Sequence, residues 1–160
     1  MERKINSVII SFGSNIGNRL YNFDKTVERL NSSNIEILKF ASLIETEPEG
    51  MDDCSDKFLN TVILANTTLE PIALLNELKR IEIDLGRNPL NKSKSLPRSV
   101  DLDIIFYDDL ILNSEELTIP HPSYKQRYFV MQPLMDIAPD WVDPELKITI
   151  NELYQQCFFS

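Results

Sequence analysis

The order of strand-like and helix-like patterns along the chain constrains its fold more than any other feature. β-Branched or alternating runs predict strands, and apolar residues at intervals of three and four predict helices. The predicted elements are a strand at 7–12, a helix at 20–30, strands at 35–44 and 58–65, a helix at 71–85 and a strand at 100–106. This order predicts an α/β (α+β) fold, a ferredoxin-like sandwich with a mixed or antiparallel sheet and helices packed on its faces.

Local signals mark where several elements begin and end. Asn18 is the predicted N-cap of the first helix, and the second helix is expected to begin at Pro71 and end at Gly86. The apolar stripes that should face the core consist of Leu20, Phe23, Val27 and Leu30 in the first helix and Leu74, Leu78, Ile81 and Leu85 in the second.

The rest of the chain carries shorter signals. Residues 107–110 are typical of a turn that would lead the last predicted strand into a hairpin partner at 111–112. Apolar spacing predicts a short helix at 130–137, and Thr149 with Glu152 resembles a capping box that opens a final helix. With no internal repeat or linker, we expect residues 1–160 to form a single domain.

Composition and charge exclude several classes of protein. The formal net charge of −9 argues against nucleic acid as a partner, because such binding depends on neutralising phosphates. No segment has the length of a membrane span, the N-terminus lacks a signal sequence, and the two cysteines lack metal-type spacing. We therefore expect a cytoplasmic monomer that binds neither nucleic acid nor membranes.

Paired carboxylates stand out in the last predicted strand. Asp101 and Asp103 alternate with apolar residues, so both should lie on one face of the strand, about 7 Å apart. At that distance they repel by about 2.4 kcal/mol at an effective dielectric of 20, but by only about 0.6 kcal/mol in water. A partly buried pair therefore requires a cation, whereas a solvated pair on an edge strand is tolerated. Val100, Leu102, Ile104 and Phe106 should occupy the opposite face.

The segment before these carboxylates is basic. Residues 86–100 contain Arg87, Lys92, Lys94 and Arg98 and no acid, a local charge of +4. A basic loop beside paired carboxylates suits a magnesium-bound polyphosphate, because the metal needs oxygen ligands and the phosphates need cations.

Three further polar residues each allow two interpretations. His121, the only histidine, lies in a second acid-free basic segment and is either structural or functional. Asn60, on an apolar strand, is either a backbone-bonded edge residue or a ligand contact. Glu82 flanks the apolar stripe of its helix, where most glutamates are solvated.

Six short motifs, each occurring once, follow one another along the chain. They are Gly13-Ser14-Asn15, Glu45-Thr46-Glu47-Pro48-x-Gly50, Phe58-Leu59-Asn60, Ile81-Glu82-x-x-Leu85-Gly86-Arg87, Pro97-Arg98-x-x-Asp101-Leu102-Asp103, and Pro120-His121 followed by Arg127-x-Phe129. With these motifs in register, residues 7–154 resemble the 6-hydroxymethyl-7,8-dihydropterin pyrophosphokinase family of folate biosynthesis. The last two motifs, at this separation, are strongly specific.

The resemblance implies an ATP-dependent diphosphotransferase that transfers diphosphate from ATP to the hydroxymethyl group of 6-hydroxymethyl-7,8-dihydropterin and releases AMP. Asp101 and Asp103 would hold two Mg²⁺ ions between ATP and the attacking hydroxyl. The residues expected to act in catalysis are Arg87, Arg98, Asp101 and Asp103. The expected ATP contacts are Glu82, Arg87, Lys92, Lys94, Arg98, His121 and Arg127, where Lys92 or Lys94 supplies additional loop charge.

The resemblance also implies a pterin site. Phe58 and Phe129 would sandwich the flat pterin ring. Asn60 and the backbone near Thr46 would read its polar edge, because a pterin edge offers both donors and acceptors to an amide.

The basic loop departs from the family pattern. Pro89 occupies the approximate position of a second arginine, and Ser95-Leu96 replaces a Trp-Gly pair. A lysine does not reproduce the two-point hydrogen bonding of an arginine. The alternative interpretation is therefore a pterin- and nucleotide-binding homologue with low or no activity. An RNA-binding module is a third possibility, but the chain lacks the basic, aromatic sheet face that this requires.

Overall fold

The computed structural model describes residues 4–47, 57–86 and 99–158. In chain order its elements are β1 (Asn6–Ser14), α1 (Arg19–Asn31), β2 (Ile35–Phe40), β3 (Ile44–Thr46), β4 (Phe58–Thr67), α2 (Pro71–Asp84), β5 (Asp101–Tyr107), β6 (Leu112–Asn113), β7 (Thr118–Ile119), the 3₁₀ turn η1 (Tyr124–Gln126), α3 (Tyr128–Ile137) and α4 (Ile150–Phe158).

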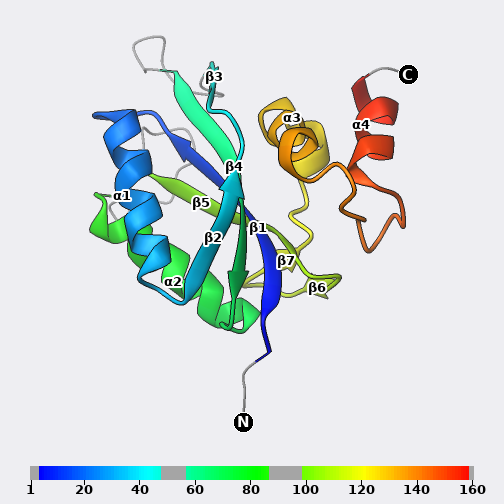
Figure 1. Cartoon of the computed structure of the whole chain (residues 1–160), viewed down its shortest axis with the longest axis horizontal. Coiled ribbons are helices and arrows are strands. Elements are labelled where there is room, and N and C mark those ends of the chain that lie inside the picture. The colour runs from blue at the N-terminus through cyan, green and yellow to red at the C-terminus, as the bar shows by residue number, and fades with distance from the viewer. Residues whose placement is uncertain (1–3, 48–56, 87–98, 159–160) are drawn as a thin grey trace.

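Strands β1 to β5 form an antiparallel sheet in the order β2-β4-β1-β5, with β3 also paired to β4, and β6 and β7 form a separate two-stranded sheet. Helices α1 and α2 cover one face of this sheet, and α3 and α4 lie on the other side (Figure 1). The element order and the strand order together confirm the predicted ferredoxin-like sandwich, with a further helical layer.

Each face of the sheet carries its own apolar cluster. Alternate residues of β1 divide between them, as a period of two requires: Val8 and Ile10 pack toward α1 and α2, whereas Ile9 packs on the opposite face. Leu74 and Leu78 of α2 join the first cluster, and residues of α3 join the second. Because both faces of the central strand are buried, the register of its neighbours is strongly specified.

A β-bulge in β5 corrects one prediction. Ile9 pairs with Phe106 and Ile10 with Ile104, so Ile105 is an extra residue on β5. Beyond the bulge the faces exchange: Phe106 joins the α3 cluster and Tyr107 the α1–α2 cluster. The prediction that Phe106 shares a face with Leu102 and Ile104 was therefore wrong, although Val100, Leu102 and Ile104 do lie together.

Other local predictions had mixed outcomes. Asn18 caps α1, because its side chain accepts a hydrogen bond from the Tyr21 N–H at 3.0 Å, but Leu20 is 60% exposed and does not join the core stripe. The predicted strand at 35–44 is two strands, β2 and β3. Residues 112–113 pair with β7 and not with β5, so the predicted hairpin was wrong.

Gly86 and Ser99, which flank residues 87–98, lie in contact. Gly86 has a φ of +112°, and a Cβ atom built on it would lie 3.0 Å from Ser99 Oγ. This conformation is rarely adopted by other residues, and the close approach leaves no room for a side chain. Glycine at position 86 therefore lets the end of α2 meet the chain that enters β5.

We predict that Gly86→Ala lowers the free energy of unfolding by about 1–3 kcal/mol, because it combines an unfavourable φ with a steric overlap. Gly17→Ala is the matched control. Its φ is +70° but the nearest atom would be 4.0 Å away, so only conformational strain, about 1 kcal/mol, should appear. Urea unfolding of both variants measures the difference, and equal stability of Gly86→Ala and the unchanged protein would contradict this account.

Candidate active site

Two predicted site residues, Asp101 and Asn60, lie in one row across the sheet on either side of Gly13. Asp101 of β5 pairs with Gly13 of β1, Gly13 pairs with Asn60 of β4, and Asn60 pairs with Ile44 of β3. By strand alternation, Asp101, Gly13 and Asn60 face the side of the sheet that carries α3. The paired carboxylates and the predicted pterin contacts therefore share one end of one face.

Two basic side chains approach the aspartates from the segment that precedes α3. His121 Nε2 lies 3.9 Å and Arg127 Nη1 lies 4.0 Å from Asp103 Oδ2. These distances are too long for direct hydrogen bonds but short enough for substantial charge interaction in a partly shielded site. The structure thus brings Asp103 together with both predicted phosphate contacts of that segment.

The imidazole of His121 has a defined orientation. Its Nδ1 accepts a hydrogen bond from the Ser123 backbone N–H at 3.1 Å, so the neutral ring carries its proton on Nε2. That proton is on the side of Asp103. The His121 backbone N–H also donates to the Ile105 carbonyl at 3.0 Å, which attaches this segment to the free edge of β5.

Glu82 is buried, contrary to the expectation that it is solvated. Its side chain comes from α2, it is 5% exposed, and its Oε2 accepts a hydrogen bond from the Leu102 backbone N–H at 2.7 Å. Leu102 lies between the two aspartates on β5, and in the described part of the chain no strand beyond β5 accepts this hydrogen bond. Glu82 therefore fixes the backbone that carries Asp101 and Asp103.

A pocket of about 340 Å³ lies along this edge of β5. Asp101, Asp103, Glu82 and His121 line it, and the rest of its wall consists of Lys79, Glu115, Glu116, Thr118 and apolar residues. Clefts that combine apolar walls with a few convergent polar groups are typical ligand sites. Glu82 and His121, two of the three predicted nucleotide contacts that the structure describes, thus border one cavity, whereas Arg127 is not among its lining residues.

The predicted pterin contacts lie at the other end of the row. Asn60 is buried, and its Nδ2 donates to Thr46 Oγ1 at 2.8 Å. Because β4 lies inside the sheet, the interpretation of Asn60 as an edge residue was wrong. A Cβ on Gly13 would lie 3.3 Å from Asn60 Oδ1 and 3.6 Å from the Phe58 ring, so the glycine leaves space above the sheet beside both side chains.

Phe129, the other predicted aromatic contact, lies in the first turn of α3 and is half-buried. The Arg127 guanidinium lies 5.9 Å from the centre of its ring, a distance compatible with a cation–π contact. Arg127 thus connects the aspartates with the aromatic side of the site.

The basic loop predictions fall outside the described residues. Arg87, Lys92, Lys94 and Arg98 all belong to residues 87–98. The flanking residues Gly86 and Ser99 lie next to each other beside the start of β5.

The aspartates fit a magnesium ion that is shared with a ligand. Within the described ranges, no three or more His, Cys, Asp or Glu side chains surround a common metal position. Magnesium is often bound through only one or two carboxylates, with phosphates and water as the remaining ligands. Asp101 and Asp103 are half-buried on one face of β5, which is compatible with that kind of binding.

Sequence reasoning missed two supports of the site. Asn22 Nδ2 donates to Ser14 Oγ and to the Ser99 carbonyl, both at 3.1 Å, and so joins the end of β1 to the start of β5. The Tyr124 hydroxyl donates to Asp143 Oδ2, and both residues are buried. Only the buried aromatic character of Tyr124 could have been suggested by the sequence, since its partner is 19 residues away.

We predict that Glu82→Ala lowers the free energy of unfolding by about 1–3 kcal/mol, because the buried Leu102 N–H loses its acceptor. Glu82→Gln keeps an acceptor oxygen and should lose less. Glu28→Ala, which removes a carboxylate that is 67% exposed, is the control and should change stability by less than about 1 kcal/mol. Stability is measured by urea unfolding. If Glu82→Ala unfolds at the same urea concentration as the unchanged protein, the assignment is wrong.

Tyr124 gives a prediction that depends on pH. Burial and the Asp143 carboxylate raise the pKa of the Tyr124 hydroxyl above its usual value of 10.0, so the folded state keeps it neutral. We expect Tyr124→Phe to cost about 1–3 kcal/mol near pH 8, since Asp143 loses a buried donor. Above pH 10.0 the unfolded tyrosine ionises and favours unfolding, so the stability gap should narrow. The free energies of unfolding of the unchanged protein and of Tyr124→Phe are measured from pH 8 upward. A difference between them that does not change with pH would contradict this account.

Comparison with known proteins identifies a family that the sequence matches. The sequence model of the 7,8-dihydro-6-hydroxymethylpterin-pyrophosphokinase (HPPK) family matches residues 9–139. The mitochondrial folate synthesis bifunctional protein of Pisum sativum is 43% identical over 86% of this chain and 26% of its own length. The 2-amino-4-hydroxy-6-hydroxymethyldihydropteridine pyrophosphokinase of Aquifex aeolicus is 33% identical over 91% of this chain and 89% of its own length.

Solved structures agree in fold. The HPPK-DHPS protein of Plasmodium falciparum with pteroate has a TM-score of 0.74 at 18% sequence identity, over 98% of this chain and 43% of that chain. The chain thus spans under half of this protein and about a quarter of the Pisum sativum relative. Among the described helices, none is long and apolar enough to cross a membrane.

Proposed function

Because the chain belongs to the 7,8-dihydro-6-hydroxymethylpterin-pyrophosphokinase family, we propose that it transfers diphosphate from ATP to the hydroxymethyl group of 6-hydroxymethyl-7,8-dihydropterin and releases AMP. The observation that carries the proposal is the row of Asp101, Gly13 and Asn60 across adjacent strands. It sets a carboxylate pair and the amide of Asn60 side by side on one face, as a reaction between a nucleotide and a pterin requires.

In this proposal the ATP polyphosphate lies over the start of β5. Asp101 and Asp103 hold two Mg²⁺ ions, which when bound neutralise charge on the phosphate oxygens. Arg127 and the Nε2–H of His121 contact the same phosphates, since His121 Nε2 and Arg127 Nη1 both lie within 4.0 Å of Asp103 Oδ2. The nucleotide occupies the pocket beside Glu82, and Arg87, Arg98 and Lys92 or Lys94 add positive charge from the loop.

The pterin lies between Phe58 and Phe129, and Asn60 reads its polar edge beside Thr46. The pterin hydroxyl oxygen forms a bond to the β-phosphorus of ATP. The bond from that phosphorus to the bridging oxygen on the AMP side breaks, and the hydroxyl proton passes to water. No side chain is assigned as general base, because positioning and charge stabilisation carry most of phosphoryl transfer.

We predict that Asp101→Asn or Asp103→Asn lowers the rate of AMP release about 10²–10³-fold, the scale for losing one electrostatic stabiliser. The assay incubates the chain with ATP, magnesium and the reduced pterin and separates AMP from ADP. Asp109→Asn is the control, because Asp109 is exposed beyond the opposite end of β5. Near-normal AMP release by both site variants would reject the assignment.

The same assay tests the alternative of a homologue with low or no activity. Calorimetric binding of both substrates by the unchanged chain, with no AMP formed over hours, would select that alternative. The Ser95-Leu96 and Pro89 departures of the loop motivate it. The monomeric state and cytoplasmic location predicted from the sequence are part of the proposal and need sedimentation and localisation measurements of their own.

A further inference from the structure

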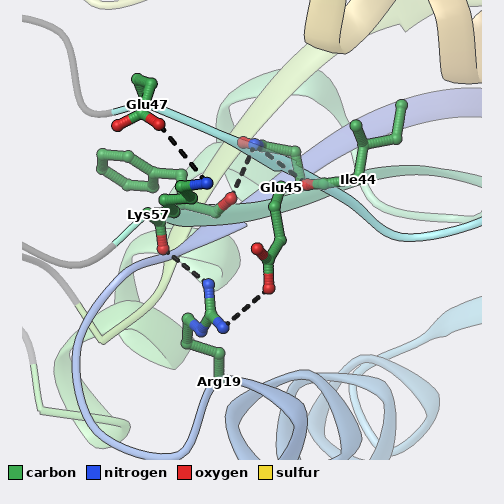
Figure 2. A network of polar contacts seen from close by, with 7 residues as sticks. Arg19, Ile44, Glu45, Glu47 and Lys57 are labelled. Carbon is green, nitrogen blue, oxygen red and sulfur yellow. Dashed lines mark hydrogen bonds and ion pairs between the residues drawn. The ribbon is translucent and has the colours of Figure 1, made fainter.

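Arg19, the first residue of α1, connects that helix to both strands that border the proposed pterin pocket. Its Nη1 donates to the Lys57 backbone carbonyl at 2.7 Å, and its Nη2 donates to Glu45 Oε1 at 2.9 Å. Figure 2 shows the guanidinium reaching these two acceptors from below the strands. One planar group therefore joins β3 to the residue that precedes β4.

Strand β3 has little other support. It is three residues long and, among the described strands, pairs only with β4, in the register Ile44 to Asn60 and Thr46 to Phe58. So short a strand at the border of a sheet is weakly held by its backbone hydrogen bonds alone. A second link, between Lys57 Nζ and Glu47 Oε1 at 3.5 Å, joins exposed side chains and contributes little.

The position of β3 determines the orientation of Asn60. The Asn60 amide nitrogen donates to Thr46 Oγ1 at 2.8 Å and to the Ile44 carbonyl at 3.4 Å, both in β3, and also to the Phe58 carbonyl of its own strand at 3.4 Å. The shortest of these hydrogen bonds is the one to Thr46, in β3. With the nitrogen held there, Oδ1 lies on the side of Gly13. The amide consequently presents an acceptor, and not a donor, to a ligand that lies over the glycine.

We propose that Arg19 is a positioning residue for the pterin: by fixing β3 against β4 it fixes the acceptor face of Asn60, and so selects a ligand edge that carries N–H donors. This inference rests on the proposed function, since it names what holds the pterin side of that site. Arginine suits the role better than lysine, because its fork reaches two acceptors at once whereas an ammonium acts as a point charge.

The test compares binding of the two substrates in Arg19→Ala. The dissociation constant of the reduced hydroxymethyl pterin is measured by calorimetry with magnesium and a non-hydrolysable ATP analogue present. That of the analogue is measured separately. We expect the pterin to bind about tenfold more weakly, the scale of one charge-assisted hydrogen bond. Binding of the analogue should change less than about twofold, because the hydrogen bonds of Arg19 to described residues go to Lys57 and Glu45, and neither residue lines the nucleotide pocket.

Two further variants separate positioning from folding. Glu45→Ala removes one of the two acceptors and should weaken the pterin in the same direction but by less. Arg19→Lys keeps the charge without the fork and should restore only part of the loss. Arg80→Ala is the matched control, because Arg80 also pairs with a glutamate, Glu77, but within a single helix. It should leave both dissociation constants unchanged.

The outcomes distinguish this inference from the function beneath it. The inference is supported if Arg19→Ala loses affinity for the pterin but not for the analogue, and if Glu45→Ala and Arg19→Lys show smaller losses of the same kind. Unchanged pterin binding, or equal loss for pterin and analogue, overturns the inference while the proposed function stands. If the unchanged chain binds the analogue but no pterin, and forms no AMP, the proposed function fails and this inference falls with it.

Discussion

The pairing of β1 with β4 on one side and β5 on the other is the constraint on which the site depends. It aligns Asp101, Gly13 and Asn60 in one row, so Asn60 and Asp101, which lie 47 and 88 residues after the glycine in the sequence, become its neighbours on separate strands. A shift of one residue would turn both aspartates toward the α1–α2 core, where apolar side chains fill the space. The buried faces of β1 therefore specify the chemistry as well as the fold.

The outer edge of β5 is the second feature that positions the site, because its backbone groups hydrogen-bond to Glu82 and to His121. Edge strands leave backbone groups that need partners. Here Glu82 accepts from the Leu102 N–H, and the His121 N–H donates to the Ile105 carbonyl. The same hydrogen bonds that satisfy the edge thus bring a helix and the segment before α3 to the carboxylates. At the other end of the row, Arg19 donates hydrogen bonds to Glu45 of β3 and to the Lys57 carbonyl, and so joins β3 to the residue that precedes β4.

Much of this arrangement follows from local sequence patterns, and the exceptions have tertiary causes. Alternation in residues 100–104 correctly predicted the face of both aspartates, because one strand suffices for that inference. The bulge at Ile105 depends on the partner strand, so the misplacement of Phe106 could not be avoided. The burial of Glu82 likewise depends on which strand edge α2 meets. The roles assigned to Arg87 and Arg98 stay predictions, since both lie outside the described residues.

The central claim is that Asp101 and Asp103 hold magnesium that binds the polyphosphate of ATP. A crystal structure of the chain with magnesium and a non-hydrolysable ATP analogue tests it most directly. The account predicts metal ions on both carboxylates, with the phosphates also contacting His121 and Arg127. Clear density for the nucleotide at another position, with both carboxylates free of metal, would contradict it.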